Sequence, residues 1–88
     1  MKVKDKIVII TGGGRGIGFG LSAAFAKEGA KLVITGRTES TLEEAKNKLE
    51  SMYGAEVLTV AADGADETAI KNVVEKTVER FGGIDAVI

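Results

Sequence analysis

The sequence lacks cysteine and histidine, two residue types on which enzymes often rely for nucleophiles, proton transfer and metal ligands. Without cysteine, the 88-residue chain has no disulfide bond and no thiolate chemistry, and its composition fits a reducing compartment. Without histidine, the commonest metal ligand is missing as well. We therefore expect one small domain with no metal site.

The sequence also lacks an excess of one charge and a long apolar run. Its 12 basic and 13 acidic residues give a net charge of −1, which argues against a nucleic-acid or anionic-membrane partner. The longest aliphatic run is Ile7–Ile10, whereas a membrane span needs about 18 apolar residues and a signal-peptide core about 7–15. We expect a cytoplasmic protein with no membrane and no nucleic-acid partner.

Four short segments rich in β-branched residues are expected to be strands. They are Lys6–Thr11, Lys31–Thr35, Glu56–Ala62 and Ile84–Ile88. Their apolar residues are continuous rather than alternating, which is typical of strands covered on both faces, as in a parallel sheet.

Between these segments lie three stretches in which apolar residues recur with helical spacing. The stripes are Ile17, Leu21, Ala24 and Phe25; Leu42, Ala45, Leu49 and Met52; and Ile70, Val74, Thr77, Val78 and Phe81. Ser40 and Glu43 fit a capping box at the start of the second helix, and Asp66 is the candidate N-cap of the third. A glycine follows each stripe and is placed to end the helix.

The alternation of strands and helices predicts an α/β fold with a parallel sheet and right-handed crossovers. Residues 1–88 correspond to the N-terminal half of a doubly wound (Rossmann) sheet, with expected strand order 3-2-1-4. The first two helices are expected on one face and the third on the other. The crevice then opens at the carboxyl end of the first strand.

The stretch "TGGGRGIG" follows this first strand, and bare backbone at a helix start is a good site for a phosphate. The phosphate loop G-x-x-x-x-G-K-[ST] does not fit, because Phe19 stands where lysine is required. The fingerprint G-x-G-x-x-G does not fit in any register either. The spacing that fits is T-G-x-x-x-G-x-G, with Thr11, Gly12, Gly16 and Gly18.

This spacing is the glycine motif of the short-chain dehydrogenase/reductase family, which the chain resembles from end to end. The segments "AKEGA", "VITGR", the strand ending in Asp63 and "FGGIDAVI" are similar to successive landmarks of that family. The resemblance implies a fold that binds a nicotinamide dinucleotide. It also implies that Gly12 lets the turn pass close to this cofactor.

The resemblance assigns a role to other residues of the motif. It implies that the main-chain N–H groups of Gly16 and Ile17 meet the pyrophosphate, and that Gly18 lets the helix pack on the sheet. It implies that Thr11 holds the turn through its side chain. The motif leaves the two glycines after Gly12 free.

The residues at the end of the second strand indicate which dinucleotide is bound. NAD-binding folds commonly have an acid here for the ribose 2′-hydroxyl, but this chain has Gly36 followed by Arg37. A guanidinium suits a 2′-phosphate, and Arg15 and Thr38 are further candidate donors. We therefore expect NADP rather than NAD as the cofactor.

The end of the third strand, Asp63-Gly64, is the candidate adenine site. The resemblance implies that Asp63 accepts from the adenine amino group and that the next main-chain N–H meets the ring. Gly64 departs from the family's usual Val, Leu or Ile, although a backbone donor survives the change. A simple loop or cap role for Asp63 stays open.

The catalytic Ser, Tyr and Lys that the resemblance implies are not found here, so no residue of the chain is assigned to catalysis. The only tyrosine, Tyr53, has Val57 where the Y-x-x-x-K spacing needs lysine. Tyr53 is better interpreted as a packing residue at a helix end. Ser22, Ser40 and Ser51 suggest nothing catalytic.

The resemblance implies an oxidoreductase that transfers hydride between NADP(H) and a small carbonyl or alcohol substrate, with an overall look similar to 3-oxoacyl-(acyl carrier protein) reductases and sugar-alcohol dehydrogenases. We expect residues 1–88 to be the dinucleotide-binding segment, truncated before the catalytic half, of a protein that is a homo-oligomer when full length. Two alternatives stay open: a dinucleotide-binding module without turnover, and a fragment stable only with its complement.

Overall fold

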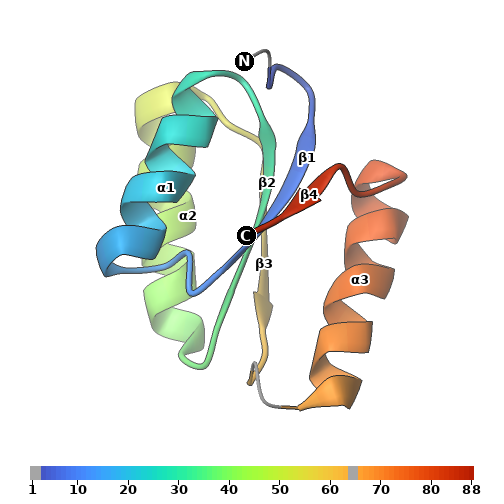
Figure 1. The fold of residues 1–88 in the computed structure, drawn as a ribbon. Helices are drawn as coiled ribbons and strands as arrows, with labels where there is room; N and C mark the ends of the chain where they lie inside the picture. Colours follow the sequence, from blue (N-terminus) through green and yellow to red (C-terminus); the bar gives the residue numbers. More distant parts are fainter. Residues whose placement is uncertain (1–2, 64–65) are drawn as a thin grey trace.

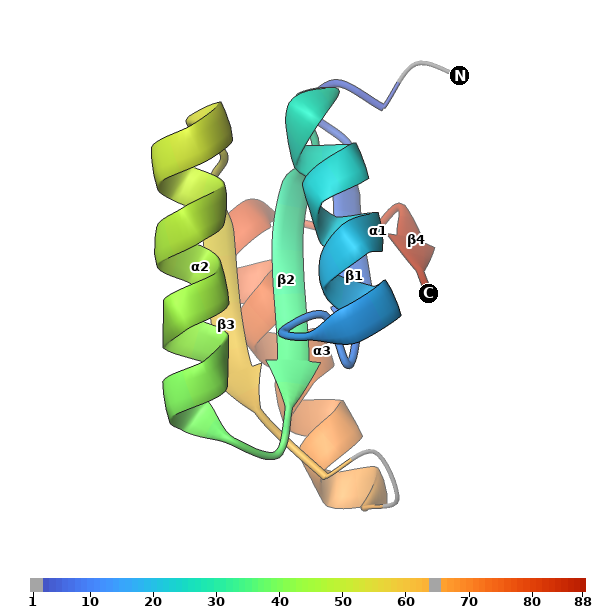
Figure 2. The same ribbon diagram turned by 90° about the vertical axis from the view of Figure 1, so that its left-hand side faces the viewer.

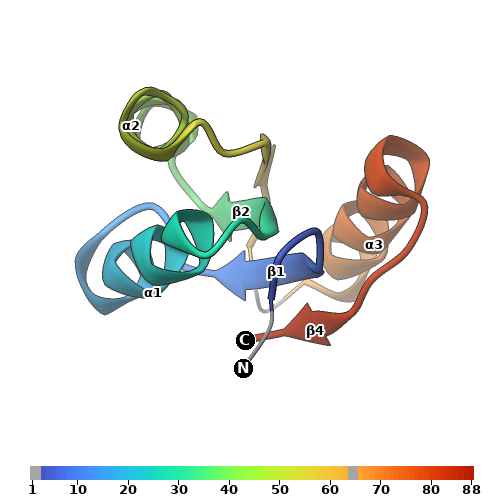
Figure 3. The same ribbon diagram turned by 90° about the horizontal axis from the view of Figure 1, so that it is seen from above.

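The computed structural model describes residues 3–63 and 66–88 and shows a parallel sheet between two layers of helices (Figure 1). The elements are β1 (Ile7–Thr11), α1 (Gly16–Lys27), β2 (Lys31–Gly36), α2 (Glu39–Tyr53), β3 (Val57–Ala61), α3 (Glu67–Phe81) and β4 (Ala86–Val87). The strand order β3-β2-β1-β4 confirms the predicted doubly wound arrangement. Figure 2 and Figure 3 show α1 and α2 on one face and α3 on the other, as right-handed crossovers require.

Both faces of the sheet are covered by apolar cores, as the continuous apolar runs predict. Successive side chains of a strand point to opposite faces, so Val8 and Ile10 join the larger core under α1 and α2. Ile9 lies between them in sequence but joins the smaller core under α3, together with Val33 and Val73. The central strands are therefore buried, and the loops at their ends are the parts available for binding.

The predicted apolar stripe is correct for α2 and largely wrong for the other two helices. Leu42, Ala45 and Leu49 are buried, although Met52 is exposed. In α1 the buried residues are Ser22 and Ala26, and in α3 they are Val73 and Thr77. The stripe residues Ile17, Leu21, Ile70, Val74 and Val78 are exposed instead. Small side chains let α1 approach the sheet closely, so side-chain size is a poor guide to its inner face.

The helix starts also differ from prediction in one case. The capping box of Ser40 and Glu43 is wrong, because α2 begins at Glu39 with Thr38 as its N-cap, two residues before the predicted N-cap Ser40. Glu43 instead accepts a hydrogen bond of 2.9 Å from the hydroxyl of Thr59 on β3. Asp66 is confirmed as the N-cap of α3, since its side chain accepts from two main-chain N–H groups of the first turn.

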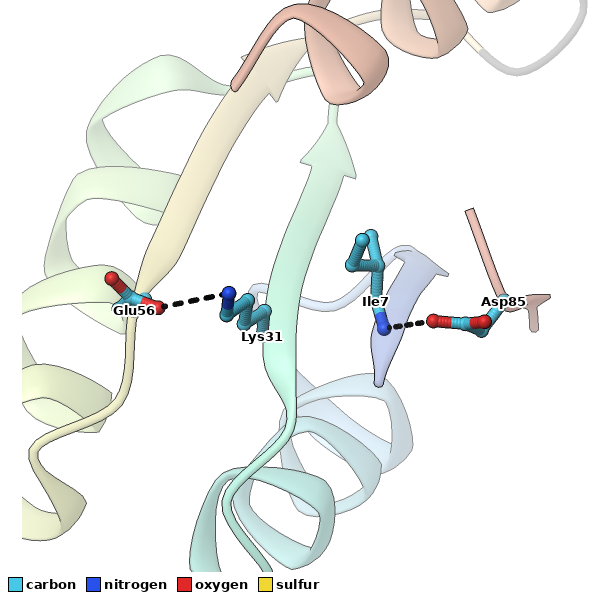
Figure 4. A network of polar contacts seen from close by, with 4 residues as sticks. All are labelled: Ile7, Lys31, Glu56 and Asp85. Carbon is cyan, nitrogen blue, oxygen red and sulfur yellow. Dashed lines mark hydrogen bonds and ion pairs between the residues drawn. The ribbon is translucent and has the colours of Figure 1, made fainter. Parts of the chain in front are cut away.

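Polar contacts at the amino ends of the strands fix their register (Figure 4). Ile7 N–H donates to the Asp85 carboxylate at 2.8 Å, and Asp85 N–H donates to the Ile7 carbonyl at 2.8 Å. Lys31 and Glu56 form an ion pair of 3.9 Å between β2 and the start of β3. These contacts hold β4 and β3 on either side of the two central strands, although β4 itself is shorter than predicted.

Candidate functional site

The turn between β1 and α1 contains two residues whose backbone is left-handed. Gly12 has φ +68° and Gly16 has φ +58°, a conformation that costs glycine little and other residues more. The Gly12 N–H donates to the Thr35 carbonyl on β2 at 2.9 Å. No described atom lies within 4 Å of where a Cβ would stand on either glycine. Both glycines therefore present backbone to open space.

The rest of the turn is packed tightly. A Cβ on Gly18 would overlap the carbonyl oxygen of Gly12, so the first turn of α1 packs against the glycine turn. The resemblance implied that Gly18 lets the helix pack on the sheet, whereas its close contact is with this turn. A Cβ on Gly13 would lie 2.7 Å from Ile34 Cγ2 and 3.0 Å from the Ile10 carbonyl oxygen. The motif accepts any residue at the position of Gly13, but the packing in this chain leaves no space for a side chain there.

One residue that contributes to the turn was missed by the sequence analysis. Ser22 is fully buried, and its hydroxyl lies 2.9 Å from the Gly18 carbonyl oxygen and 3.2 Å from that of Gly13. The available signal was a serine four residues after Gly18, a spacing at which a hydroxyl can bond back to the helix backbone. The link to Gly13, nine residues earlier, has no sequence signature.

The start of α1 is suited to an anion. Arg15 is the N-cap with an extended backbone, and α1, which the structure describes throughout, has no acidic residue in its first turn. The main-chain N–H groups of Gly16, Ile17 and Gly18 have no partner within the helix, and they carry its partial positive charge. Such a helix start binds phosphate groups well. Ile17 exposes 87% of its surface beside these donors.

A small hollow at the carboxyl ends of β1 and β2 brings together the predicted 2′-phosphate residues. It measures about 40 Å³ and is lined by Gly12, Gly14, Arg15, Thr35, Gly36, Arg37, Thr38, Thr41 and Leu42. Arg15 comes from the turn before α1, and Arg37 and Thr38 come from the connection between β2 and α2, so two segments meet here. Among the residues that the structure describes, no Asp or Glu lines the hollow. Its charged groups are therefore both guanidinium ions.

Arg37 also contacts the predicted adenine residue. Its guanidinium lies 3.8 Å from the Asp63 carboxylate, and the side chains are 80% and 54% exposed. The Ala62 N–H donates to the Gly36 carbonyl at 2.8 Å, which holds the tips of β2 and β3 together. Gly64, the other predicted adenine residue, lies outside the described residues.

Thr11 does not hold the glycine turn as predicted. Its hydroxyl donates to the Ile88 carbonyl at 2.9 Å, and its main-chain N–H donates to the same oxygen at 2.9 Å. Thr11 is the last residue of β1, so its side chain reaches the neighbouring strand β4 rather than the turn that follows. Its contribution to the site is to fix the end of the strand from which the turn starts.

Residues 3–63 and 66–88 contain neither a cluster of metal ligands nor a membrane-spanning helix. Within these ranges, no three acidic, histidine or cysteine side chains gather where they could hold a metal ion. The helices of the same ranges are too short or too polar to cross a bilayer. The glycine turn and the basic hollow beside it form the candidate site.

Comparison with known proteins agrees with this geometry. The short chain dehydrogenase family model matches residues 6–88, and the chain belongs to this family. It is 47% identical to 12alpha-hydroxysteroid dehydrogenase of a Clostridium species over 94% of this chain and 34% of that protein. Among solved structures, L-sorbose reductase of Gluconobacter frateurii, complexed with NADPH and L-sorbose, superimposes with a TM-score of 0.94 at 38% identity, covering 99% of this chain and 34% of that one.

An alcohol dehydrogenase of the archaeon Thermococcus sibiricus, complexed with 5-hydroxy-NADP, gives a TM-score of 0.89 at 33% identity. The match covers 93% of this chain and 35% of that one. The chain thus spans about a third of the length of the relatives it matches. The family and the doubly wound fold are established, and the relatives named here are oxidoreductases that act on different small molecules.

Proposed function

We propose that this chain forms the NADP(H)-binding part of an oxidoreductase that transfers hydride between NADP(H) and a carbonyl or alcohol substrate. The observation that carries the proposal is the basic hollow, where Arg15, Arg37 and Thr38 meet beside the glycine turn. Membership of the short chain dehydrogenase family supports it, as do the NADPH and 5-hydroxy-NADP complexes of two similar structures.

In this proposal the pyrophosphate lies against the start of α1. The N–H groups of Gly16 and Ile17 have no partner within the helix and would donate to phosphate oxygens. Gly12 and Gly16 present bare backbone to open space, so a phosphate can approach without meeting a side chain. The exposed Ile17 offers an apolar surface beside the same donors.

The hollow would hold the 2′-phosphate of NADP(H). This group carries about −1.5 to −2 charges, and a guanidinium gives it a forked pair of donors. Arg37 and Arg15 face the hollow from two segments, and Thr38 adds a hydroxyl. Gly36 occupies the position at which an acid would repel the phosphate. The same arrangement offers the 2′-hydroxyl of NAD no carboxylate acceptor, so NADP is favoured.

Asp63 would serve the adenine ring at the edge of this hollow. Its carboxylate is an acceptor for the adenine amino group, and its contact with Arg37 supports neighbouring positions for the adenine and the 2′-phosphate. The main-chain N–H of Gly64 belongs to the proposal as a further contact with the ring.

NADP(H) supplies the hydride, and the proton-transfer groups of such an enzyme are not provided by this chain. Tyr53, the only tyrosine, ends α2 and packs against the larger core. Residues 1–88 would therefore be the dinucleotide-binding segment, and the substrate would bind elsewhere. This substrate would be a small carbonyl or alcohol compound of the type that 3-oxoacyl-(acyl carrier protein) reductases or sugar-alcohol dehydrogenases use. A cytoplasmic location and a homo-oligomeric assembly are part of the same proposal.

Two other candidates are a dinucleotide-binding module without turnover and a fragment that is stable only beside a complementary polypeptide. The exposed apolar residues of α3, which are Ile70, Val74 and Val78, favour the dependent fragment, together with Val87 and Ile88 at the open edge of β4. Carbonyl reduction by the intact protein in the presence of NADPH would exclude a module without turnover, and cooperative unfolding of residues 1–88 alone would exclude the dependent fragment.

The proposed cofactor preference is tested by Arg37→Asp. The change removes a charge-assisted hydrogen bond worth roughly 1.5–3 kcal/mol and adds a repulsive charge, so we expect the NADP-to-NAD affinity ratio to fall by at least about tenfold. Isothermal titration calorimetry with both dinucleotides measures this ratio in the intact protein. Lys71→Asp, on the opposite face of the sheet, alters net charge equally and is expected to leave the ratio unchanged. An unaltered ratio for Arg37→Asp would refute the assignment.

A further inference from the structure

The buried hydroxyl of Ser22 is not explained by the proposed contacts with the cofactor. In the described part of the chain, two hydroxyl-bearing residues, Ser22 and Thr77, are fully buried within helices. Their hydroxyl groups differ in the acceptors that they contact. Thr77 donates to the carbonyl of Val73 in the preceding turn of α3 at 2.7 Å, which is the usual way for a helix to satisfy a buried hydroxyl. Ser22 makes the equivalent contact with Gly18 at 2.9 Å, but it also contacts Gly13, which lies outside the helix.

The two acceptors of Ser22 stand on either side of the phosphate-binding turn. Gly13 lies where the chain leaves β1, and Gly18 lies where α1 begins, so one side chain ties the entry of the turn to its exit. Gly13 is buried and has no space for a side chain of its own, so its position depends on its neighbours. The Ser22 hydroxyl has one proton, which it shares between this carbonyl oxygen at 3.2 Å and that of Gly18 at 2.9 Å, so it helps to satisfy a polar group that water does not reach.

We infer that Ser22 is a positioning residue for dinucleotide binding, which acts by holding the turn between Gly13 and Gly18 closed so that the N–H groups of Gly16 and Ile17 converge on one pyrophosphate. The inference rests on the proposed function of the same turn. Ser22 is fully buried, so it would act through the turn and not by touching the cofactor. Its effect is therefore expected to be larger on the pyrophosphate, which NAD and NADP share, than on the 2′-phosphate, to which the turn contributes only Arg15 as a side-chain donor.

The test compares Ser22→Ala with Thr77→Val in the intact protein. Each change removes a buried hydroxyl with little loss of volume. Alanine favours a helix more than serine does, and valine and threonine have similar helix propensities, so both variants are expected to fold. The binding of NADP, NAD and adenosine 2′-monophosphate is measured by isothermal titration calorimetry, and unfolding by urea. For Ser22→Ala we expect the dissociation constants of NADP and NAD to rise together, roughly two- to tenfold, and that of adenosine 2′-monophosphate to rise less.

Thr77→Val is expected to lower the free energy of unfolding about as much as Ser22→Ala does, because each change removes a buried hydroxyl. It is expected to leave all three affinities unchanged, because the Thr77 hydroxyl donates only within α3. The inference is overturned if Ser22→Ala binds both dinucleotides as the unaltered protein does, or if Ser22→Ala and Thr77→Val weaken all three ligands equally. If the unaltered protein binds neither dinucleotide, the proposed function itself fails, and this result is separate from either outcome for the variants.

Discussion

The glycine turn and the strand tips beside it form two halves of one site, and they are built in opposite ways. The turn is fixed by packing: Gly18 rests on Gly12, Gly13 has no spare space, and Ser22 is fully buried behind them. The strand tips carry exposed side chains, and Arg37 and Asp63 meet there in an ion pair of 3.8 Å.

Because of this contrast, different parts of the site would bind the portion that NAD and NADP share and select between NAD and NADP. In the proposed complex, main-chain donors would contact what NAD and NADP have in common, and their positions depend on the fold. Exposed side chains would contact the 2′ position, and exposed ion pairs contribute only about 0–1 kcal/mol to stability. Cofactor preference can therefore change with little loss of stability, whereas the pyrophosphate site cannot change without affecting the fold.

The largest effect is expected where packing is tightest. Gly18→Ala places a Cβ against the Gly12 carbonyl, so the turn or the helix start must move. We expect a loss of stability of about 1–3 kcal/mol, as for other overpacked sites, and at least about tenfold weaker binding of both dinucleotides. Urea unfolding and calorimetry measure the two effects.

Gly20→Ala is the matched control for this change. Gly20 lies two residues further along α1, and no described atom stands within 4 Å of its added Cβ. Alanine in a helix interior is favoured over glycine by up to about 1 kcal/mol, so this variant is expected to be more stable, with unaltered binding. Equal behaviour of the two variants would show that helix propensity, rather than contact with the turn, decides the outcome.

Arg37→Asp is expected to have the intermediate effect, and Asp63→Asn the smallest. Asparagine keeps an acceptor oxygen for the adenine amino group but removes the charge that holds Arg37, leaving the guanidinium more available to a 2′-phosphate. An exposed pair is worth roughly 0.2–1 kcal/mol, so the NADP-to-NAD affinity ratio is expected to rise by up to about fivefold. Using the ratio cancels any change at the adenine ring, which both dinucleotides share.

In an Arg37→Gln background, Asp63→Asn is expected to change this ratio less, because the ion pair is already gone. A fall in the ratio in the chain with Arg37 intact would mean that Asp63 orients the guanidinium toward the phosphate rather than competing for it. Either direction is resolved by titrating both dinucleotides into four variants of one double-mutant cycle.

The order of strands and helices was predictable because continuous apolar runs and helical stripes alternate along the chain. The position of the site was predictable too, since Gly12, Arg15 and Arg37 mark the carboxyl ends of β1 and β2. These features depend on local sequence. The convergence of Arg15 and Arg37 on one hollow follows from the strand order alone.

The inner faces of α1 and α3 were not predictable, because both helices carry apolar residues on more than one side. Size favoured Ile17 for the core, yet the buried residues of α1 are Ser22 and Ala26. The partners of Ser22 depend on how closely the helix approaches the turn. Thr11 likewise has a partner in β4, at the other end of the sequence. Contacts between distant segments leave no local pattern.

The pairing of β1 with β4 has a consequence for the order of folding. The Ile88 carbonyl accepts two hydrogen bonds from Thr11, 77 residues away, whereas β1 meets β2 after a short crossover. Long loops close slowly, so the β1–β4 ladder is expected to form last and to open first. Hydrogen exchange would show this as faster exchange of the Thr11 amide than of the Leu32 amide, which donates to the Glu56 carbonyl at the start of β3.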